Sequence, residues 1–326
     1  MANAQTCPMP KLIFCPGEPH PQCHAATLAK TPQGLVAAWF GGTHEKHQDV
    51  GIWQSRHLQG TWSPPVQITR GQDTTGIQVP CWNPVLHQTG SGGPLLLFYK
   101  VGATIAGWST MLRRSQDDGA SWSNPVQLPS ATCGPVKNKP LELADGVLLC
   151  GGSLEPTWQN WQVYFSRTDD LGESWHVTGP CTQPAEFDAI QPSLFDLSGL
   201  KPDRNAILAL CRTRQGVVGR MESADGGLTW SPMTATNVPN PDSGLDGTSL
   251  ADGRLVMVCN DTLRGRSPLS LLISEDGQSF RRVMTLEDDA GEFSYPSVIR
   301  DVDTLHIVYT HRRTSIAWQA IDVTSL

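Results

Sequence analysis

Six segments of this chain open with polar or aromatic residues whose chemistry would suit acid–base work or ligand binding. Aligned on the Leu or Val that follows, they open at His24, Trp82, Asn138, Ile190, Asp246 and Ser294, with Asn83, Lys139, Gln191 and Tyr295 adjacent. A histidine can act as a general acid or base near neutral pH. Any one of these side chains could simply be a hydrogen-bonded strand terminus. If they converge, they exceed what a structural axis needs and form a candidate site.

Polar loops add a carboxylate and several arginines. Asp49 ends the polar stretch 41–49 and is a general-acid candidate if burial raises its pKa towards the working pH. The arginine candidates, at comparable points after later apolar runs, are Arg212, Arg264, Arg266 and Arg312. A guanidinium grips a carboxylate through two parallel hydrogen bonds, so a cluster of these arginines would suit an acidic sugar. Taken singly, Asp49 could be a solvated loop residue and each arginine a solubilising one.

A repeated turn predicts the scaffold that positions these residues. The pattern S-x-D-x-G-x-[ST]-W starts at Ser115 and Ser223, with variants that start at Thr168, Ser274 and Ser55. Its closing aromatic residue falls at Trp62, Trp122, Trp175, Trp230 and Phe280, in steps of 50 to 60 residues. Asp can accept hydrogen bonds from nearby backbone N–H groups, and Gly takes the positive-φ position of the turn. We therefore interpret these Asp residues as structural, with the Trp rings buried between neighbouring units.

The spacing indicates an all-β protein, a six-bladed β-propeller with four-stranded antiparallel blades and Asp-box turns. Apolar runs mark the strands of six units, and 326 residues give about 54 for each. The last unit lacks an outer strand, which the N-terminal residues 11–14 could supply to close the ring. Residues 1–326 are expected to form one domain. In a propeller the first strand of each blade lines the axis, and ligands bind at one mouth.

Composition excludes several classes of partner. The net charge of −7 argues against nucleic acid or an anionic membrane surface. No apolar run approaches the roughly 20 residues of a membrane-spanning helix, and the first residues lack the features of a signal peptide. Nine cysteines without C-x-x-C pairing suggest a reduced, cytoplasmic protein. We expect no cofactor and no metal, because His44 and His47 lack further ligands. A closed ring also has no sheet edge that demands an oligomer.

The turn repeat, its spacing and the arginine-bearing strands resemble the sialidase (neuraminidase) superfamily, in its bacterial neuraminidase repeat branch. The resemblance covers about residues 23–320. It implies cleavage of a terminal sialic acid by an arginine triad, a Tyr nucleophile activated by Glu, and an Asp acid/base. Asp49 would match the acid/base and Tyr295 the nucleophile. Arg212 would match the second triad arginine, and Arg264 or Arg266 the third.

Two positions depart from this pattern. His24 stands where the first triad arginine is expected, and Ile190-Gln191 stand where the activating Glu would open blade four. We therefore expect an exo-acting glycosidase for a terminal acidic sugar of an oligosaccharide, with sialic acid itself in doubt. The alternatives are a uronate-directed lyase or a rhamnosidase that uses His24, and a non-catalytic propeller that binds a sugar or a protein.

Overall fold

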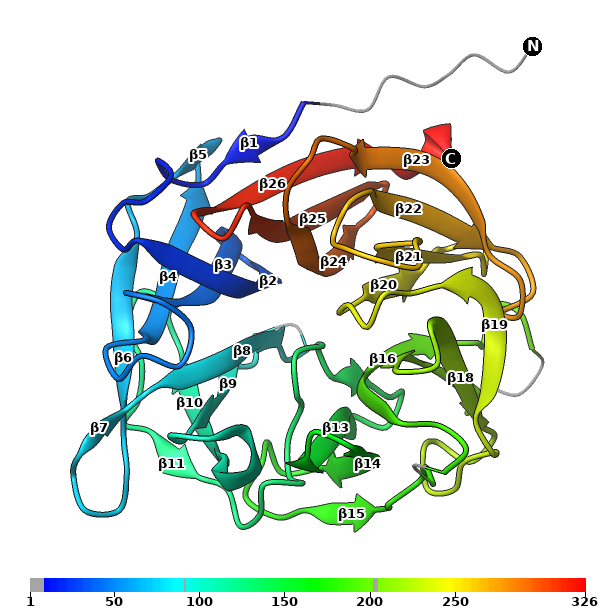
Figure 1. Cartoon of the computed structure of the whole chain (residues 1–326), viewed down its shortest axis with the longest axis horizontal. Coiled ribbons are helices and arrows are strands. Elements are labelled where there is room, and N and C mark those ends of the chain that lie inside the picture. The colour runs from blue at the N-terminus through cyan, green and yellow to red at the C-terminus, as the bar shows by residue number, and fades with distance from the viewer. Residues whose placement is uncertain (1–8, 91, 184, 202–204) are drawn as a thin grey trace.

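The chain folds into six small antiparallel sheets arranged as blades around one axis, as the turn spacing predicts (Figure 1). This computed structural model describes residues 9–90, 92–183, 185–201 and 205–326. The inner strands of blades one to six are β2 (Gln22–Thr31), β8 (Cys81–Gln88), β12 (Leu141–Glu142), β16 (Ala189–Asp196), β20 (Asp246–Ser249) and β24 (Phe293–Asp301). Their starts surround the axis and carry most of the candidate residues.

The second and third strands of each blade extend outward from the inner strand. The second strands are β3 (Gly34–Gly42), β9 (Leu95–Val101), β13 (Leu148–Thr157), β17 (Ile207–Thr213), β21 (Leu255–Cys259) and β25 (Thr304–His311). The third strands are β4 (Gly51–Leu58), β10 (Ser109–Ser115), β14 (Asn160–Thr168), β18 (Val217–Ser223), β22 (Leu269–Ser274) and β26 (Ser315–Asp322). Alternation along these strands places apolar side chains on both faces, where they pack between blades.

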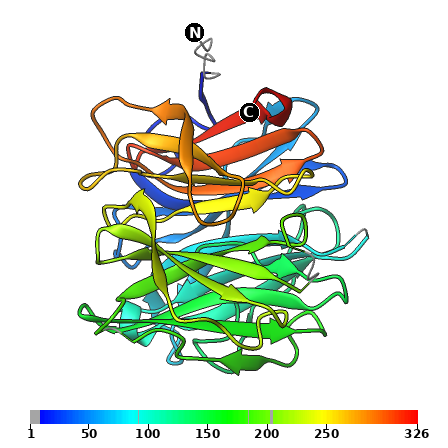
Figure 2. The same ribbon diagram turned by 90° about the vertical axis from the view of Figure 1, so that its right-hand side faces the viewer.

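Outer strands complete the blades, and the N-terminus closes the ring. They are β6 (Val66–Gln72), β11 (Val126–Gln127), β15 (His176–Thr178), β19 (Thr234–Pro239), β23 (Arg281–Glu287) and, in blade six, β1 (Lys11–Leu12). Blade one also carries β5 (Thr61–Trp62) and β7 (Gln78–Val79), and the two 3₁₀ turns are η1 (Ile105–Gly107) and η2 (Val323–Ser325). Lys11 pairs with Trp318 of β26, so the predicted closure is confirmed. β1 and the C-terminal turn lie at the same edge of the molecule (Figure 2).

Each repeated turn is held by its own Asp and Ser or Thr. In blade two the Asp117 carboxylate accepts hydrogen bonds from the Ser121 backbone N–H and hydroxyl, at 2.8 and 2.6 Å. The Ser115 hydroxyl accepts one from the Gly119 N–H at 2.8 Å. The Ser121 contacts, the largest cause, lower the pKa of Asp117 to about 2. A carboxylate held ionised in this way is structural, as the sequence indicates.

Cysteines and helices of the described ranges add two facts. The eight cysteines found there are free thiols, most of them buried, and Cys150, Cys211 and Cys259 lie in the core. No helix within the same ranges has the length and apolar character needed to cross a bilayer.

The closing Trp of a turn stabilises the contact between two blades, and this gives a test. Trp230 of blade four stacks on Phe165 of blade three, with ring centres 3.7 Å apart and planes 13° from parallel. We expect Trp230→Ala to lower the free energy of unfolding by about 3 kcal/mol, because it removes buried aromatic surface. Trp158→Ala, at a ring that is 68% exposed, should change it by less than about 0.5 kcal/mol. Chemical denaturation measures both, and equal effects would contradict this account of the turn.

Candidate functional site

Bulges near the start of four inner strands set the geometry of the axis mouth. The pairing register shifts between His24 and Thr27 in β2, and at the corresponding points of β8, β16 and β24. One residue inside each bulge has positive φ, and these residues are Ala25 (54°), Asn83 (38°), Gln191 (57°) and Tyr295 (53°). Non-glycine residues rarely adopt this conformation, which costs roughly 1–3 kcal/mol. Three predicted site residues are thus the strained residues of the bulges.

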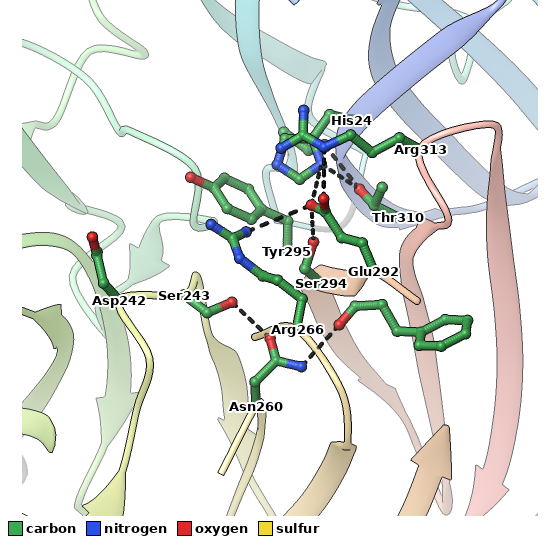
Figure 3. A network of polar contacts seen from close by, with 12 residues as sticks. His24, Asp242, Ser243, Asn260, Arg266, Glu292, Ser294, Tyr295, Thr310 and Arg313 are labelled. Carbon is green, nitrogen blue, oxygen red and sulfur yellow. Dashed lines mark hydrogen bonds and ion pairs between the residues drawn. The ribbon is translucent and has the colours of Figure 1, made fainter. Parts of the chain in front are cut away.

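Tyr295 is the centre of the site. Its hydroxyl oxygen accepts a hydrogen bond from Arg212 Nη1 at 2.6 Å, and Gln191 Nε2 lies 3.5 Å away. The Tyr295 ring contacts the His24 ring, with centres 4.2 Å apart. The Arg266 guanidinium carbon lies 5.4 Å from the Tyr295 ring centre (Figure 3). The structure therefore brings five residues predicted from the sequence into one cluster.

One carboxylate links the cationic side of this cluster (Figure 3). Glu292 accepts a hydrogen bond from Arg313 Nε at 2.8 Å, and its Oε1 lies 3.8 Å from Arg266 Nη1 and 4.0 Å from His24 Nδ1. Burial raises the pKa of Glu292, but Arg313 and Arg266 together hold it below its usual value. The Arg266 Nη1 atom is buried and has no hydrogen-bond partner among the described residues. Its only close anionic neighbour in the described ranges is Glu292, in an ion pair at 3.8 Å, so its hydrogen-bonding capacity is unused by the described residues and could serve an anionic ligand.

His24 is a neutral imidazole at neutral pH. Burial, the largest cause, and the charges of Arg313 and Arg266 hold the pKa of His24 well below 6.5. Its Nδ1 hydrogen-bonds to the Thr310 hydroxyl at 2.9 Å, while Nε2 has no hydrogen bond to any residue in the described ranges. A buried neutral imidazole with one free nitrogen has the features of a general base.

Lys137 ties the cluster to the opposite blades, and sequence reasoning missed it. Its ammonium donates to Asn138 Oδ1 at 2.8 Å and to the backbone oxygens of Leu245 (2.7 Å) and Pro296. Pro296 follows Tyr295, and Lys137 Nζ lies 5.8 Å from the Tyr295 ring centre. Burial lowers the pKa of Lys137 to about 7. A signal was present, because Lys137 directly precedes the residue taken as the opening of blade three.

Two predicted binding residues, Lys139 and Asp246, belong to a polar network that ties the blades together. Lys139 pairs with Asp246 at 3.0 Å and also donates to the Gly247 carbonyl at 2.7 Å. Asp246 is 1% exposed and accepts further hydrogen bonds from the Ser193 hydroxyl and the Val298 N–H. These bonds occupy the Asp246 carboxylate.

Asn138, Asn83 and Trp82 have different surroundings. Asn138 donates to the Gln191 carbonyl at 2.9 Å, so it supports the bulge of blade four. Asn83 is buried inside its own bulge, and its amide makes no hydrogen bond within the described ranges. Trp82 is buried and donates to the Gly102 carbonyl at 2.9 Å.

Asp49 lies on the loop between β3 and β4 and is half-exposed. Its carboxylate accepts hydrogen bonds from the Thr43 N–H (3.0 Å) and hydroxyl (2.6 Å), and lies 2.7 Å from His47 Nδ1. Burial raises the pKa of Asp49, but Thr43 and His47 lower it more, and the net shift is downward. The raised pKa on which the sequence interpretation depended is therefore absent in this state.

The arginine candidates separate into two groups. Arg212 and Arg266 contact Tyr295, whereas Arg264 is exposed and its guanidinium forms no hydrogen bond or ion pair with a described residue. Arg312 pairs with Asp289 at 3.1 Å and packs over Phe293. It is the next residue, Arg313, that reaches the mouth. The predicted segment does reach the mouth, but neighbouring residues of a turn point in different directions, and spacing alone could not distinguish Arg312 from Arg313.

Comparison with known proteins identifies the family and the fold of this chain. A family model described as "BNR repeat-like domain" matches residues 33–307. The chain belongs to the BNR repeat-like domain family. Among the described residues of this BNR repeat-like chain, no group of three or more His, Cys, Asp or Glu could hold a metal ion.

Several solved structures share the fold of this BNR repeat-like chain at low identity. A Hadza microbial sialidase is 19% identical with a TM-score of 0.81, over 98% of this chain and 69% of that one. The NanB sialidase from Streptococcus pneumoniae is 13% identical with a TM-score of 0.77, over 98% and 71%. An α-L-arabinanase from Penicillium chrysogenum is 17% identical with a TM-score of 0.69, over 98% and 99%. At these identities the similarity establishes the fold alone.

The lowered pKa of His24 predicts how stability depends on pH. The unfolded chain binds a proton at His24 below about pH 6.5, and the folded protein does not. Protonation therefore favours the unfolded chain, and the free energy of unfolding decreases as pH falls below 6.5. We expect the free energy of unfolding to drop by about 2 kcal/mol more in the wild type than in His24→Gln between pH 6.5 and 5. Urea denaturation at the two pH values tests this. His176→Gln, at an exposed histidine, is the control and should behave as wild type.

Proposed function

We propose that this protein is an exo-acting glycosidase that removes a terminal acidic sugar at the axis mouth. The observation that carries the proposal is the Arg266 guanidinium over the Tyr295 ring, with a buried Nη1 that lacks a hydrogen-bond partner among the described residues. A partly exposed guanidinium over the ring of a nucleophilic tyrosine would hold a sugar carboxylate next to the anomeric carbon. The sialidase and arabinanase structures with the same fold support glycoside chemistry for this architecture.

Arg266 and Arg212 have separate roles in this proposal. Arg212 Nε donates a hydrogen bond to the Asp242 carboxylate at 2.8 Å, and Nη2 lies 2.7 Å from the same carboxylate. Its Nη1 donates to the Tyr295 hydroxyl. Its donors are thus engaged within the protein, and it orients the Tyr295 hydroxyl. Arg266 retains free donors and takes the carboxylate. Arg313, held by Glu292 and Glu45, adds positive charge to the same side where the family pattern has a further arginine.

The proposed reaction is a double displacement. The Tyr295 oxygen bonds to the anomeric carbon and gives its proton to His24 Nε2, a base that replaces the expected Glu because the amide of Gln191 cannot accept it. The glycosidic C–O bond breaks, and the leaving oxygen takes a proton from the His47–Asp49 pair, in which His47 Nδ1 lies 2.7 Å from the Asp49 carboxylate. Water then displaces Tyr295, returning the protons and releasing the sugar.

Elimination is the second candidate, favoured by one specific observation. His24 is neutral and contacts Tyr295, and an amide, Gln191, lies beside the Tyr295 hydroxyl where a carboxylate would assist a nucleophile. A His–Tyr pair could abstract the proton next to a uronate carboxylate and protonate the leaving oxygen. Incubation with uronate oligosaccharides distinguishes the two reactions, because elimination creates a double bond that absorbs in the near ultraviolet and hydrolysis does not.

The arginine assignment gives a matched pair of variants. We expect Arg266→Met to lower kcat/KM on an acidic aryl glycoside by about 10- to 100-fold, since charged hydrogen bonds contribute about 1.5–3 kcal/mol. Arg264→Met, two residues away on the same loop but exposed, should leave it within about twofold. A larger loss in Arg264→Met would reverse the assignment. No turnover of any sialoside, uronide or other acidic glycoside by the wild type would refute the proposed function.

The proton donor can be tested by varying the leaving group. Asp49→Asn should lower kcat/KM by about 100-fold for an oligosaccharide or alkyl glycoside, whose leaving oxygen needs a proton. It should have little effect on a nitrophenyl glycoside, whose leaving group departs without one. Tyr295→Phe should abolish turnover of both. A uniform loss in Asp49→Asn across both leaving groups would show that Asp49 is structural.

A further inference from the structure

The repeat places four side chains of different chemistry at one equivalent position. In blades two to five, the first residue of each turn motif pairs with Leu95, Leu148, Ile207 and Leu255 of the second strand. Five residues further along those strands lie Lys100, Ser153, Arg212 and Asn260, all of them buried. Arg212 at this position contacts Tyr295. Lys100 in blade two and Ser153 in blade three therefore occupy the position that Arg212 occupies in blade four.

Lys100 and Ser153 line a small cavity between blades two and three, of about 90 Å³, together with Trp108 and Glu155. The Ser153 hydroxyl and the Trp108 indole nitrogen are buried and have no hydrogen-bond partner among the described residues. Ser153 is 5% exposed. The Glu155 carboxylate makes no hydrogen bond or ion pair in the described ranges. Unpaired buried polar groups cost free energy, so the cavity is suited to a ligand that pairs with them.

Lys100 contributes a further donor. Its ammonium binds the Thr110 hydroxyl at 2.6 Å and the Ala131 carbonyl at 3.1 Å, and so has one N–H left. Burial lowers the pKa of Lys100 to about 7 and raises the pKa of Glu155 to about 7. Each group is consequently about half ionised near pH 7, so the cavity holds a partial positive and a partial negative charge.

The small cavity adjoins a larger pocket of about 310 Å³ that shares Glu155 and adds Trp82 and Trp158. Ring contacts connect this pocket to the centre of the site. The ring centre of Trp82 lies 5.4 Å from that of Trp108 and 6.2 Å from that of Phe40. The ring centre of Phe40 lies 5.7 Å from that of His24. The 68% exposed Trp158 provides an open ring face at the rim. The buried Trp82 and Phe40 rings thus place the pocket beside the mouth, and the exposed Trp158 ring is the surface that a ligand could contact.

Charge and volume identify the ligand class. An anion would face Glu155, and a cation would face Lys100, so the cavity favours a neutral group that both donates and accepts hydrogen bonds. A volume of about 90 Å³ corresponds to about three waters, which matches a hydroxymethyl or a pair of hydroxyls. We propose that these two connected spaces, the blade two–three pocket, bind a neutral hexose next to the acidic sugar, with its hydroxymethyl group in the cavity and its ring on the exposed Trp158. The adjacency to an acidic sugar rests on the proposed function.

Binding can be measured without turnover, through the indole N–H resonance of Trp108, assigned with Trp108→Phe. Methyl glucoside and methyl galactoside should shift this resonance in the intact protein at millimolar concentrations. Methyl xyloside, which lacks the hydroxymethyl group, should bind about fivefold more weakly, as expected for the loss of about 1 kcal/mol in hydrogen bonds.

A matched pair of serine variants tests the cavity itself. Ser153→Ala should weaken methyl hexoside binding by about fivefold, and Lys100→Met should weaken it similarly if its melting curve shows a folded protein. Ser270→Ala is the control, because Ser270 is also buried with an unpartnered hydroxyl but does not line the cavity. It should bind as wild type.

The outcomes separate this proposal from the proposed function. A Trp108 resonance that does not move with any hexoside, or equal binding of xyloside and glucoside, would overturn the hexose site whatever the activity. Hexoside binding with no turnover of any acidic glycoside would support the pocket while refuting the glycosidase. Equal weakening by Ser153→Ala and Ser270→Ala would show that the cavity is not the binding site.

Discussion

Tyr295 reaches the axis because its own backbone takes the left-handed conformation, φ 53°, inside the bulge of β24. The surroundings have to enforce this strained state. Lys137 does so by binding the Pro296 carbonyl, and Gly244 leaves the space, since a Cβ there would lie 3.1 Å from Tyr295 Cδ2 and 3.2 Å from Lys137 Cε. With Arg212 on its hydroxyl, Tyr295 is fixed at both ends. The geometry of the remaining site follows from this position.

The charges around Tyr295 are arranged unevenly. Asp242 pairs with Arg212 through two contacts. Glu292 is the carboxylate that pairs with Arg266, and both Glu292 and Glu45 pair with Arg313. Excess positive charge therefore lies beside His24, and it contributes to keeping that imidazole neutral. One feature thus underlies both roles that we propose for the mouth, the binding of an anion and the action of His24 as a base. Since the mouth has low exposure, these interactions are stronger than they would be in water.

The fold could be read from the sequence because its signal is local and repeated. The turn motif is stabilised by hydrogen bonds within eight residues, so its spacing reports the blades directly. The inner-strand alignment also placed His24, Gln191 and Tyr295 at one mouth. It could not show that Asp246 and Lys139 satisfy each other, or that Arg313 rather than Arg312 turns inward, because these outcomes depend on contacts between distant blades. Lys100 and Ser153 could have been found in the sequence, because they lie at the same position of their second strands, relative to the turn motif, as Arg212 does.

The most direct test of the account is to trap the sugar on Tyr295. An activated acidic glycosyl fluoride, with a second fluorine beside the anomeric centre to slow release, should form a covalent adduct, and peptide mass spectrometry should locate it on Tyr295. The adduct should be absent in Tyr295→Phe and reduced in Arg266→Met. Labelling of another residue, or turnover of acidic glycosides with no adduct under these conditions, would contradict Tyr295 as the nucleophile.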